Sequence, residues 1–306
     1  MNAEWVAGPP TMTEEELGAN RNNFYEDCLA RKLDTDEYWQ SRMPDWNKVK
    51  VPMLSTANWG GQGLHPRGNF EGFTQSASND KWLEVHGREH WSEFYTDYGR
   101  EMQLAFFDHF LKGENNGWED RRVQLQARHK DKFVERFEDA WPIPSTQWTK
   151  FYLQADGHGL TEASGEQAAT VSYRGFSEGV TFLSAPLEAE AEITGPIAAK
   201  LFVSSSTVDA DMFLVFRVFD ASFREVTFQG ALDPHTPIAQ GWLRASHRKL
   251  DEAQSEPYRP FHSHDEKQPL NPGEPVELDV EIWPTSIVVP AGHRIALSVR
   301  GRDYEY

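Results

Sequence analysis

Two histidines near the end of one short apolar run, His86 and His90, are the side chains best suited to proton transfer in this chain. The run, from Trp82 to Val85, stops at a glycine. An imidazole in a loop just beyond a strand is a candidate general base. We favour His90, since His86 lies closer to the end of the strand.

The segments around these histidines follow the order expected of a parallel sheet. A first apolar run, from Val51 to Leu54, stops in a glycine-rich loop. The segment between the two runs, Gly68 to Ser78, has helical spacing, with Phe70 and Phe73 three residues apart. Strand, loop, helix, strand and loop make a βαβ unit, in which reactive groups lie in the loops beyond the strand ends.

Ser177 stands in Gly175-Phe-Ser-Glu-Gly179, which matches the G-x-S-x-G pattern of a nucleophile elbow. That turn requires a strand before the serine and a helix after it. Here the β-branched and aromatic run Val180-Thr-Phe-Leu follows, and His90 lies far upstream of the serine. We therefore do not expect Ser177 to be a nucleophile.

His262 and His264 could place two imidazoles on one face of a strand for a metal ion. The adjoining Asp265-Glu-Lys267 favours a solvated loop instead, and no third ligand stands nearby. The sequence also lacks a P-loop, a G-x-G-x-x-G motif and an H-E-x-x-H motif. We expect neither a metal nor another cofactor.

The composition is that of an acidic globular chain with enough residues for two domains. A formal net charge of -18 disfavours a nucleic-acid partner, because no basic stripe is available to contact phosphates. No apolar run is long enough to cross a membrane, and the first residues lack the pattern of a secretion signal. Cys28 is the single cysteine, which is compatible with a reducing compartment. We expect a cytoplasmic protein without a membrane partner.

Residues 1 to about 50 predict helices without a sheet of their own. Thr13-Glu-Glu-Glu16 is a capping-box pattern, so Thr13 is the expected N-cap of the first helix. A second helix is expected to begin near Asp34 to Asp36 and to end before Pro44. The strongest helical pattern runs from Ser92 to Lys112, and its aromatic stripe is expected to pack in the core.

After the rigid linker Trp141-Pro-Ile-Pro144, the pattern changes to short β-rich runs that glycine and proline separate. Many short strands without helices between them are typical of an antiparallel sandwich or a jelly roll. A strand is also predicted before the linker, from Val123 to Ala127. The runs after it are Phe151–Leu153, Val171–Tyr173, Ala198–Val203, Met212–Phe219, Glu225–Phe228, Val276–Trp283 and Ile295–Val299.

Several motifs, taken in order, resemble the Xaa-Pro dipeptidyl-peptidase and cocaine-esterase group of serine hydrolases. The resemblance covers nearly the whole chain. The motifs are Val51-Pro-Met-Leu with Asn58-Trp, Leu83 to His90, Phe106-Phe-Asp-His-Phe-Leu-Lys-Gly113, Thr194-Gly-Pro, Ala199-Lys-Leu-Phe-Val-Ser-Ser-Ser, Asp209-Ala-Asp, Gly241-Trp-Leu-Arg-Ala-Ser-His-Arg248 and Val289-Pro-Ala-Gly-His-Arg-Ile295.

The resemblance implies an α/β plus all-β protein in three parts. These are a helical cap remnant in residues 1–48, the C-terminal part of an α/β-hydrolase domain in residues 49–140, and a jelly-roll β-sandwich in residues 141–306. It also implies a Ser–acid–His triad that cleaves a small-molecule or peptide acyl substrate through an acyl-enzyme. A homo-oligomer is compatible with this assignment.

Carried onto this sequence, the family histidine falls on His90, which would be the general base. The family serine lies upstream of the cap, so we expect the nucleophile to lie outside this chain and the chain alone to be inactive. The family's acid falls on Gly61, in Trp59-Gly-Gly61, where an aspartate is expected. Glu71 on the following helix is therefore our candidate acid, followed by Glu89. We also expect the open edge of the incomplete sheet to favour pairing or aggregation.

Two functions of different classes remain open at this point. The first is a serine hydrolase of the dipeptidyl-peptidase or esterase type, which the motifs around His90 favour. The second is a non-catalytic binding module built on the jelly roll, which the glycine at position 61 favours. A serine elbow encoded upstream of Met1 would support the first function.

Overall fold

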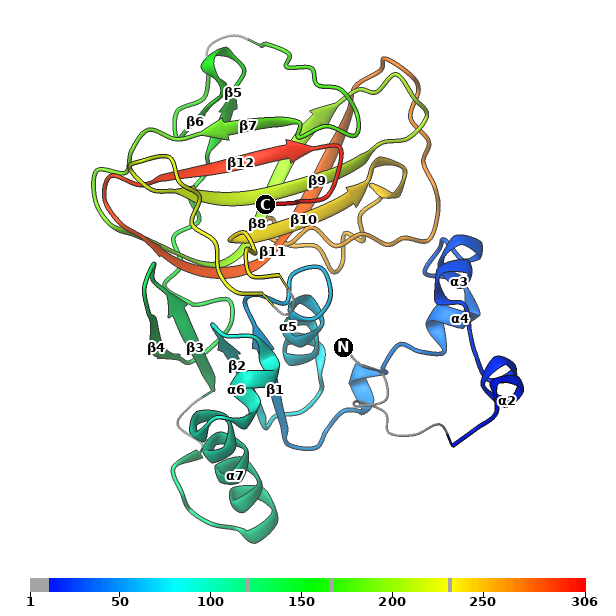
Figure 1. The fold of residues 1–306 in the computed structure, drawn as a ribbon, viewed down its shortest axis with the longest axis vertical. Coiled ribbons are helices and arrows are strands. Elements are labelled where there is room, and N and C mark those ends of the chain that lie inside the picture. The colour runs from blue at the N-terminus through cyan, green and yellow to red at the C-terminus, as the bar shows by residue number, and fades with distance from the viewer. Residues whose placement is uncertain (1–10, 119–121, 166–167, 231–232) are drawn as a thin grey trace. The chain divides into compact units, whose positions relative to one another are not determined.

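The computed structural model describes residues 11–118, 122–165, 168–230 and 233–306, apart from the side chain of His90 (Figure 1). It divides into two compact units. The first comprises the chain up to Pro44 with His264–Glu266, and the second comprises Asp45–Ser263 with Lys267–Tyr306.

The first unit is helical. Its helices are α2 (Glu14–Ala19), α3 (Phe24–Ala30) and α4 (Glu37–Gln40). The capping box at Thr13 is confirmed: its side chain accepts a hydrogen bond from the backbone of Glu16, and the Glu16 side chain accepts one from the backbone of Thr13. The predicted second helix begins as expected, directly after Asp36, whose carboxylate accepts a hydrogen bond from the backbone N–H of Tyr38. It is shorter than expected, because it ends at Gln40.

The second unit begins with the predicted βαβ unit. Strand β1 (Met53–Asn58) leads through helix α5 (Pro66–Gln75) to strand β2 (Lys81–His86), and β1 and β2 pair in parallel. Strand β3 (Val123–Arg128) adds in parallel on the other side of β2. Strand β4 (Phe133–Glu138), which the sequence analysis missed, pairs antiparallel with β3.

Each face of these parallel strands is covered by a different helix. Because side chains alternate along a strand, Leu83 and Val85 point to one face, where they pack against Phe70 and other side chains near α5. Trp82 points to the opposite face and packs against Phe106 of helix α7 (Asp97–Lys112). Glu84 and His86 share the α7 face with Trp82, which places two ionisable side chains beneath that helix.

The prediction of one helix from Ser92 to Lys112 was wrong in one respect. The helix is interrupted at Thr96, which separates α6 (His90–Tyr95) from α7. Thr96 is extended, and its hydroxyl accepts a hydrogen bond from the backbone N–H of Gly99, so it caps α7. Gly99 fits there because a β-carbon at this position would collide with the backbone carbonyl oxygens of Glu93 and Phe94 in α6.

The remaining strands complete two six-stranded sheets. The first sheet has the order β1-β2-β3-β11-β8, with β4 beside β3, and the second has the order β10-β9-β12-β7-β6-β5. The bounds are β5 (Tyr152–Gln154), β6 (Gly159–Thr161), β7 (Val180–Leu183), β8 (Ala191–Val203), β9 (Asp211–Phe219), β10 (Ala239–Arg244), β11 (Val276–Val289) and β12 (Arg294–Arg300).

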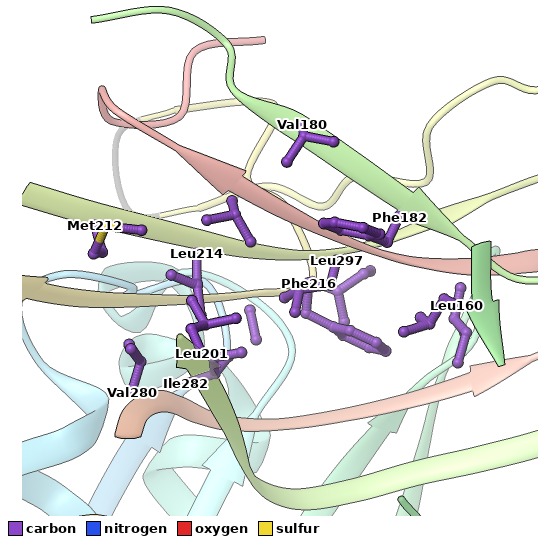
Figure 2. Packing of buried hydrophobic residues seen from close by; sticks show 14 of the residues in the cluster. Leu160, Val180, Phe182, Leu201, Met212, Leu214, Phe216, Val280, Ile282 and Leu297 are labelled. Carbon is purple, nitrogen blue, oxygen red and sulfur yellow. The ribbon is translucent and has the colours of Figure 1, made fainter. Parts of the chain in front are cut away.

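The main hydrophobic core lies between β8 and β11 of the first sheet and the strands of the second. Figure 2 shows Leu201 and Ile282, from the first sheet, close to Leu214 and Leu297 from the second. All four side chains are buried. Apolar residues at alternate positions of long strands therefore produce the layered core that the sequence predicted.

Two of the predicted strands are absent from the described residues. Val171–Tyr173 has no strand conformation, and the Glu225–Phe228 run forms only isolated bridges, Phe219 with Glu225 and Phe228 with Thr236. A tight turn explains the second case. The Asp220 carboxylate accepts hydrogen bonds from the backbone N–H groups of Ser222 and Arg224, which ends β9 and redirects the chain.

The parallel strands and the sandwich are joined at Arg128. This residue of β3 is opposite Ile287 of β11, and its side chain is fully buried. Its guanidinium donates hydrogen bonds to the backbone carbonyls of Ser286 and Ile238, at 3.0 and 2.9 Å, and lies 4.7 Å from the centre of the Phe228 ring. Burial lowers the pKa of Arg128 to about 9, so the group is still charged at neutral pH.

We predict that Arg128→Ala lowers the free energy of unfolding by about 3–5 kcal/mol, because it leaves a cavity and removes the buried hydrogen bonds that the guanidinium donates. The matched control is Arg244→Ala on β10, whose partner is the exposed Asp211 and whose loss should cost less than about 1 kcal/mol. Urea unfolding of both variants measures the difference. Equal costs would show that Arg128 does not hold the two parts together.

Candidate functional site

A buried hydrogen-bonded network lies beneath α7 at the end of β2. The carboxylate of Glu84 has its Oε2 atom 3.0 Å from Nδ1 of His86, and its Oε1 atom accepts a hydrogen bond of 3.0 Å from the hydroxyl of Tyr98. Tyr98 in turn accepts one from Gln124 of β3. Glu84 and His86 are 2% and 5% exposed, so the network is isolated from solvent.

Burial is the main influence on the ionisation of this network. It raises the pKa of Glu84, although the hydrogen bonds that the carboxylate makes with His86 and with the Tyr98 hydroxyl act in the opposite direction. Burial, together with the negative charge of Glu84, also raises the pKa of Tyr98. Tyr98 is therefore a neutral donor over the whole physiological range.

This network borders a cavity of about 350 Å³ at the carboxyl ends of β1 and β2. Three buried polar atoms on its lining residues have no hydrogen-bond partner within the described part of the chain: Nδ2 of Asn58, Nε2 of His86 and Oε2 of Glu93. Buried polar atoms are nearly always paired, so three unpaired ones around one cavity indicate a place for a ligand.

Aromatic side chains line the same cavity. Trp91 of α6 is 54% exposed, and Phe94 and Tyr95 are exposed beside it. The prediction that the whole aromatic stripe packs in the core was therefore wrong for Phe94 and Tyr95, although Phe106 does pack there. Thr96 ends α6 before α7 begins, so Phe94 and Tyr95 do not continue the face of α7 that packs in the core.

His90 is the first residue of α6, not a residue of a loop as predicted. Its side chain lies outside the described part of the structure, so its role as general base stays a prediction. The residue before it, Glu89, is the N-cap of α6 and accepts a hydrogen bond from the hydroxyl of Ser92.

Glu71, the candidate acid, belongs to a different set of contacts. Its Oε1 atom accepts a hydrogen bond of 2.7 Å from Arg259, and its Oε2 atom accepts one from Gln75. A second ion pair, Arg67 with Glu281 at 2.8 Å, links the same helix to β11. Both oxygens of Glu71 are thus occupied, one by Arg259 from the segment between β10 and β11 and one by Gln75 of α5 itself, and its role as catalytic acid stays a prediction.

The glycine-rich loop after β1 is closely packed. A β-carbon on Gly61, the position of the family's acid, would lie 2.4 Å from Oδ1 of the buried Asn58 and 3.2 Å from Cδ of Pro66. A β-carbon on Gly60 would lie 2.8 Å from the backbone of both Gln229 and Gly230. A carboxylate at position 61 would therefore require the Asn58 side chain to move.

The other sequence candidates do not form a site. Ser177 is followed directly by β7 and not by a helix, and its hydroxyl accepts a hydrogen bond from the backbone of Gly179. The prediction that it is not part of an elbow is consistent with this geometry. Within the described residues, no group of three or more His, Cys, Asp or Glu side chains could hold a metal ion, which includes the region of His262 and His264.

A second cavity, of about 800 Å³, lies between the start of α7 and the β3–β4 turn. Its lining carries charges of both signs, including Arg88, Lys132 and Asp97, and Glu93 borders both cavities. The smaller cavity is the better candidate site, because the three unpaired polar atoms and the strand ends coincide there.

The sequence analysis considered His86 but missed its pairing with Glu84. The signal was present, because residues two apart in a strand share one face. The sequence did not show that Tyr98 of α7, which lies fourteen residues after Glu84, would cover this face of the strand.

Comparisons with known proteins identify the family of this chain. Residues 116–306 match the family described as X-Pro dipeptidyl-peptidase C-terminal non-catalytic domain. The chain belongs to this family. The family resemblance inferred from the ordered motifs is thereby confirmed, and the site described above lies mostly before the matched residues.

The relatives of this family member are hydrolases by name. A serine esterase of Mycobacterium tuberculosis is 29% identical over 65% of this chain and 35% of its own length, and the cocaine esterase of a Rhodococcus strain is 26% identical over 66% and 38%. The crystal structure of a CocE/NonD family hydrolase from Staphylococcus aureus matches with 32% identity and a TM-score of 0.90, over 99% of this chain and 54% of the other. The chain thus spans about a third to a half of the length of these relatives.

Among the helices in the described residues, none is both long and apolar enough to cross a membrane.

We predict that Gly60→Ala destabilises the second unit by about 1–3 kcal/mol, because the new methyl group would collide with backbone atoms of Gln229 and Gly230. Gly68→Ala is the matched control, since open space surrounds Gly68 in α5 and alanine should stabilise the helix by roughly 0.5–1 kcal/mol. Thermal unfolding compares the two. A Gly60→Ala variant as stable as Gly68→Ala would contradict the tight contact.

Proposed function

We propose that this chain is part of a hydrolase of the Xaa-Pro dipeptidyl-peptidase or esterase type, which cleaves an ester or amide through an acyl-enzyme. The observation that carries the proposal is the cavity at the carboxyl ends of β1 and β2, bordered by the start of the helix that His90 opens. Catalytic groups of α/β enzymes lie at this end of the sheet. The names of the relatives support the same reaction class.

In this proposal the parallel strands are the last part of an α/β-hydrolase domain, the helices before them are a cap remnant, and the remaining strands form a jelly roll. His90 is the general base. The serine nucleophile comes from the part of the catalytic domain that this chain does not span. Glu71 is the candidate acid because it is the carboxylate nearest in sequence to position 61. Its ion pair with Arg259 makes it the least supported of the three proposed triad residues.

The second candidate is a non-catalytic binding module, and one observation favours it. The family's acid position is Gly61, and a side chain at this position would require the Asn58 side chain to move. A protein that only binds ligands needs no acid there. The matched family is itself described as non-catalytic, although the match begins only at residue 116.

Reaction with a fluorophosphonate probe separates the two functions. We expect no labelling of the 306-residue chain, and labelling of a version extended upstream through a serine elbow. His90→Ala should abolish the labelling of the extended version, because the serine would lose its base; a loss of about 10³-fold or more in rate is typical. His235→Ala, which changes an exposed histidine of the sandwich, is the control and should label normally.

Two results would contradict the proposal. Labelling of the short chain that disappears in Ser177→Ala would show that the Gly175–Gly179 motif is a nucleophile site after all. Absence of labelling in both versions would favour the binding module.

A further inference from the structure

We propose that His86 is a ligand-contacting residue that accepts a hydrogen bond from a protonated amine bound in the cavity, with Glu84 and Tyr98 as the residues that position it. The inference takes the cavity of the proposed function as the ligand site. It adds the chemical class of the ligand and the residue that recognises it.

The hydrogen bonds around Glu84 determine which nitrogen of His86 carries the proton. Gln124 donates to the Tyr98 oxygen, so the hydroxyl proton of Tyr98 is directed to Oε1 of Glu84. The other carboxylate oxygen, Oε2, then accepts from Nδ1–H of His86. In this tautomer of the neutral imidazole, Nε2 has a lone pair and no proton.

His86 is one of the residues that line the cavity. Nε2 of His86 is buried and has no hydrogen-bond partner in the described part of the chain. A buried acceptor without a donor costs about 1–3 kcal/mol. A ligand that brings a donor removes this cost, whereas a ligand that presents only acceptors does not.

Three further features select an amine among the possible donors. Glu93 contributes a second buried carboxylate to the residues that line this cavity, and its Oε2 atom forms an ion pair with Nε of Arg88 at 3.7 Å, beyond hydrogen-bond distance. No lysine or arginine is among the residues that line this cavity. Trp91 and Phe94 add aromatic faces, which attract cations.

Asn58 completes the polar set. Its Nδ2 atom is a buried donor without a partner in the described residues, and it lies at the end of β1, beside β2. An oxygen acceptor on the same ligand would satisfy it. The cavity is thus suited to a small molecule that carries a protonated amine, an apolar body and an oxygen acceptor.

The test measures binding of three probes of similar shape to the intact 306-residue chain: benzylamine, benzyl alcohol and benzoate at neutral pH. We expect benzylamine to bind about tenfold more tightly than the other two, because only it brings a positive donor to His86 and Glu93. Titration calorimetry or quenching of tryptophan fluorescence gives the dissociation constants.

Two variants assign the preference to His86. His86→Ala should reduce the preference for benzylamine to about threefold or less, since Glu93 alone remains. Glu84→Gln keeps the shape of the side chain, but its amide would donate to Nδ1 and move the proton of His86 to Nε2. Benzylamine should then bind about tenfold more weakly, while benzamide, which presents a carbonyl acceptor, should bind more tightly. The control His235→Ala should change none of these affinities.

Equal affinities of the three probes for the wild-type chain, or an unchanged amine preference in folded His86→Ala, would overturn the inference. Should His86→Ala fail to fold, Glu84→Gln decides alone, because a merely structural role would weaken benzylamine and benzamide binding to the same extent. Binding needs no serine, so these results are independent of the fluorophosphonate labelling. A failed labelling experiment with an intact amine preference would leave the inference standing.

Discussion

The buried guanidinium of Arg128 is the contact on which the arrangement of the second unit depends. It sits where the parallel strands end and the sandwich strand β11 begins to pair, and only one pair of residues bridges β3 and β11 there. A buried guanidinium requires hydrogen-bond acceptors, and the backbone carbonyls of Ser286 and Ile238 provide two of them. Both carbonyls belong to the sandwich. The hydrogen bonds therefore offset the cost of burying the charge only when the sandwich packs against the parallel strands.

The docking has a consequence for the cavity. The sandwich also contacts the glycine-rich loop that follows β1: Oε1 of Gln62 accepts a hydrogen bond from the backbone N–H of Gln240, and Gly60 lies against the backbone of Gln229. Arg67 and Glu281 connect the next helix to β11. A domain described as non-catalytic thus fixes the loop that begins at Asn58, on the lining of the cavity, and we infer that it acts as a positioning element for the site.

The sequence predicted the parts of this fold that depend on local pattern. The βαβ unit around β1 and β2 was identified because each strand is a compact apolar run that ends at glycine, and the capping box at Thr13 is a local signal of the same kind. The interruption at Thr96 was missed, since threonine does not break a helical pattern and its capping bond to Gly99 appears only when the chain is folded. The sequence pointed to the segment beyond β2, where we place the candidate site, but it did not reveal the contact between Glu84 and Tyr98, because that contact is tertiary.

Two of the buried carboxylates, Glu71 and Glu84, differ in how their hydrogen-bonded networks end. Glu71 was the nearer acid to the family position in sequence, yet an arginine and a glutamine occupy both of its oxygens, and no demand remains for a ligand. Glu84 is also fully hydrogen-bonded, but one of its partners is a histidine whose second nitrogen has no partner in the described residues. A network that ends in an unpaired atom at a cavity is less stable than one that closes on itself. Such a network carries a cost in stability, which the ligand that we propose for the cavity would remove.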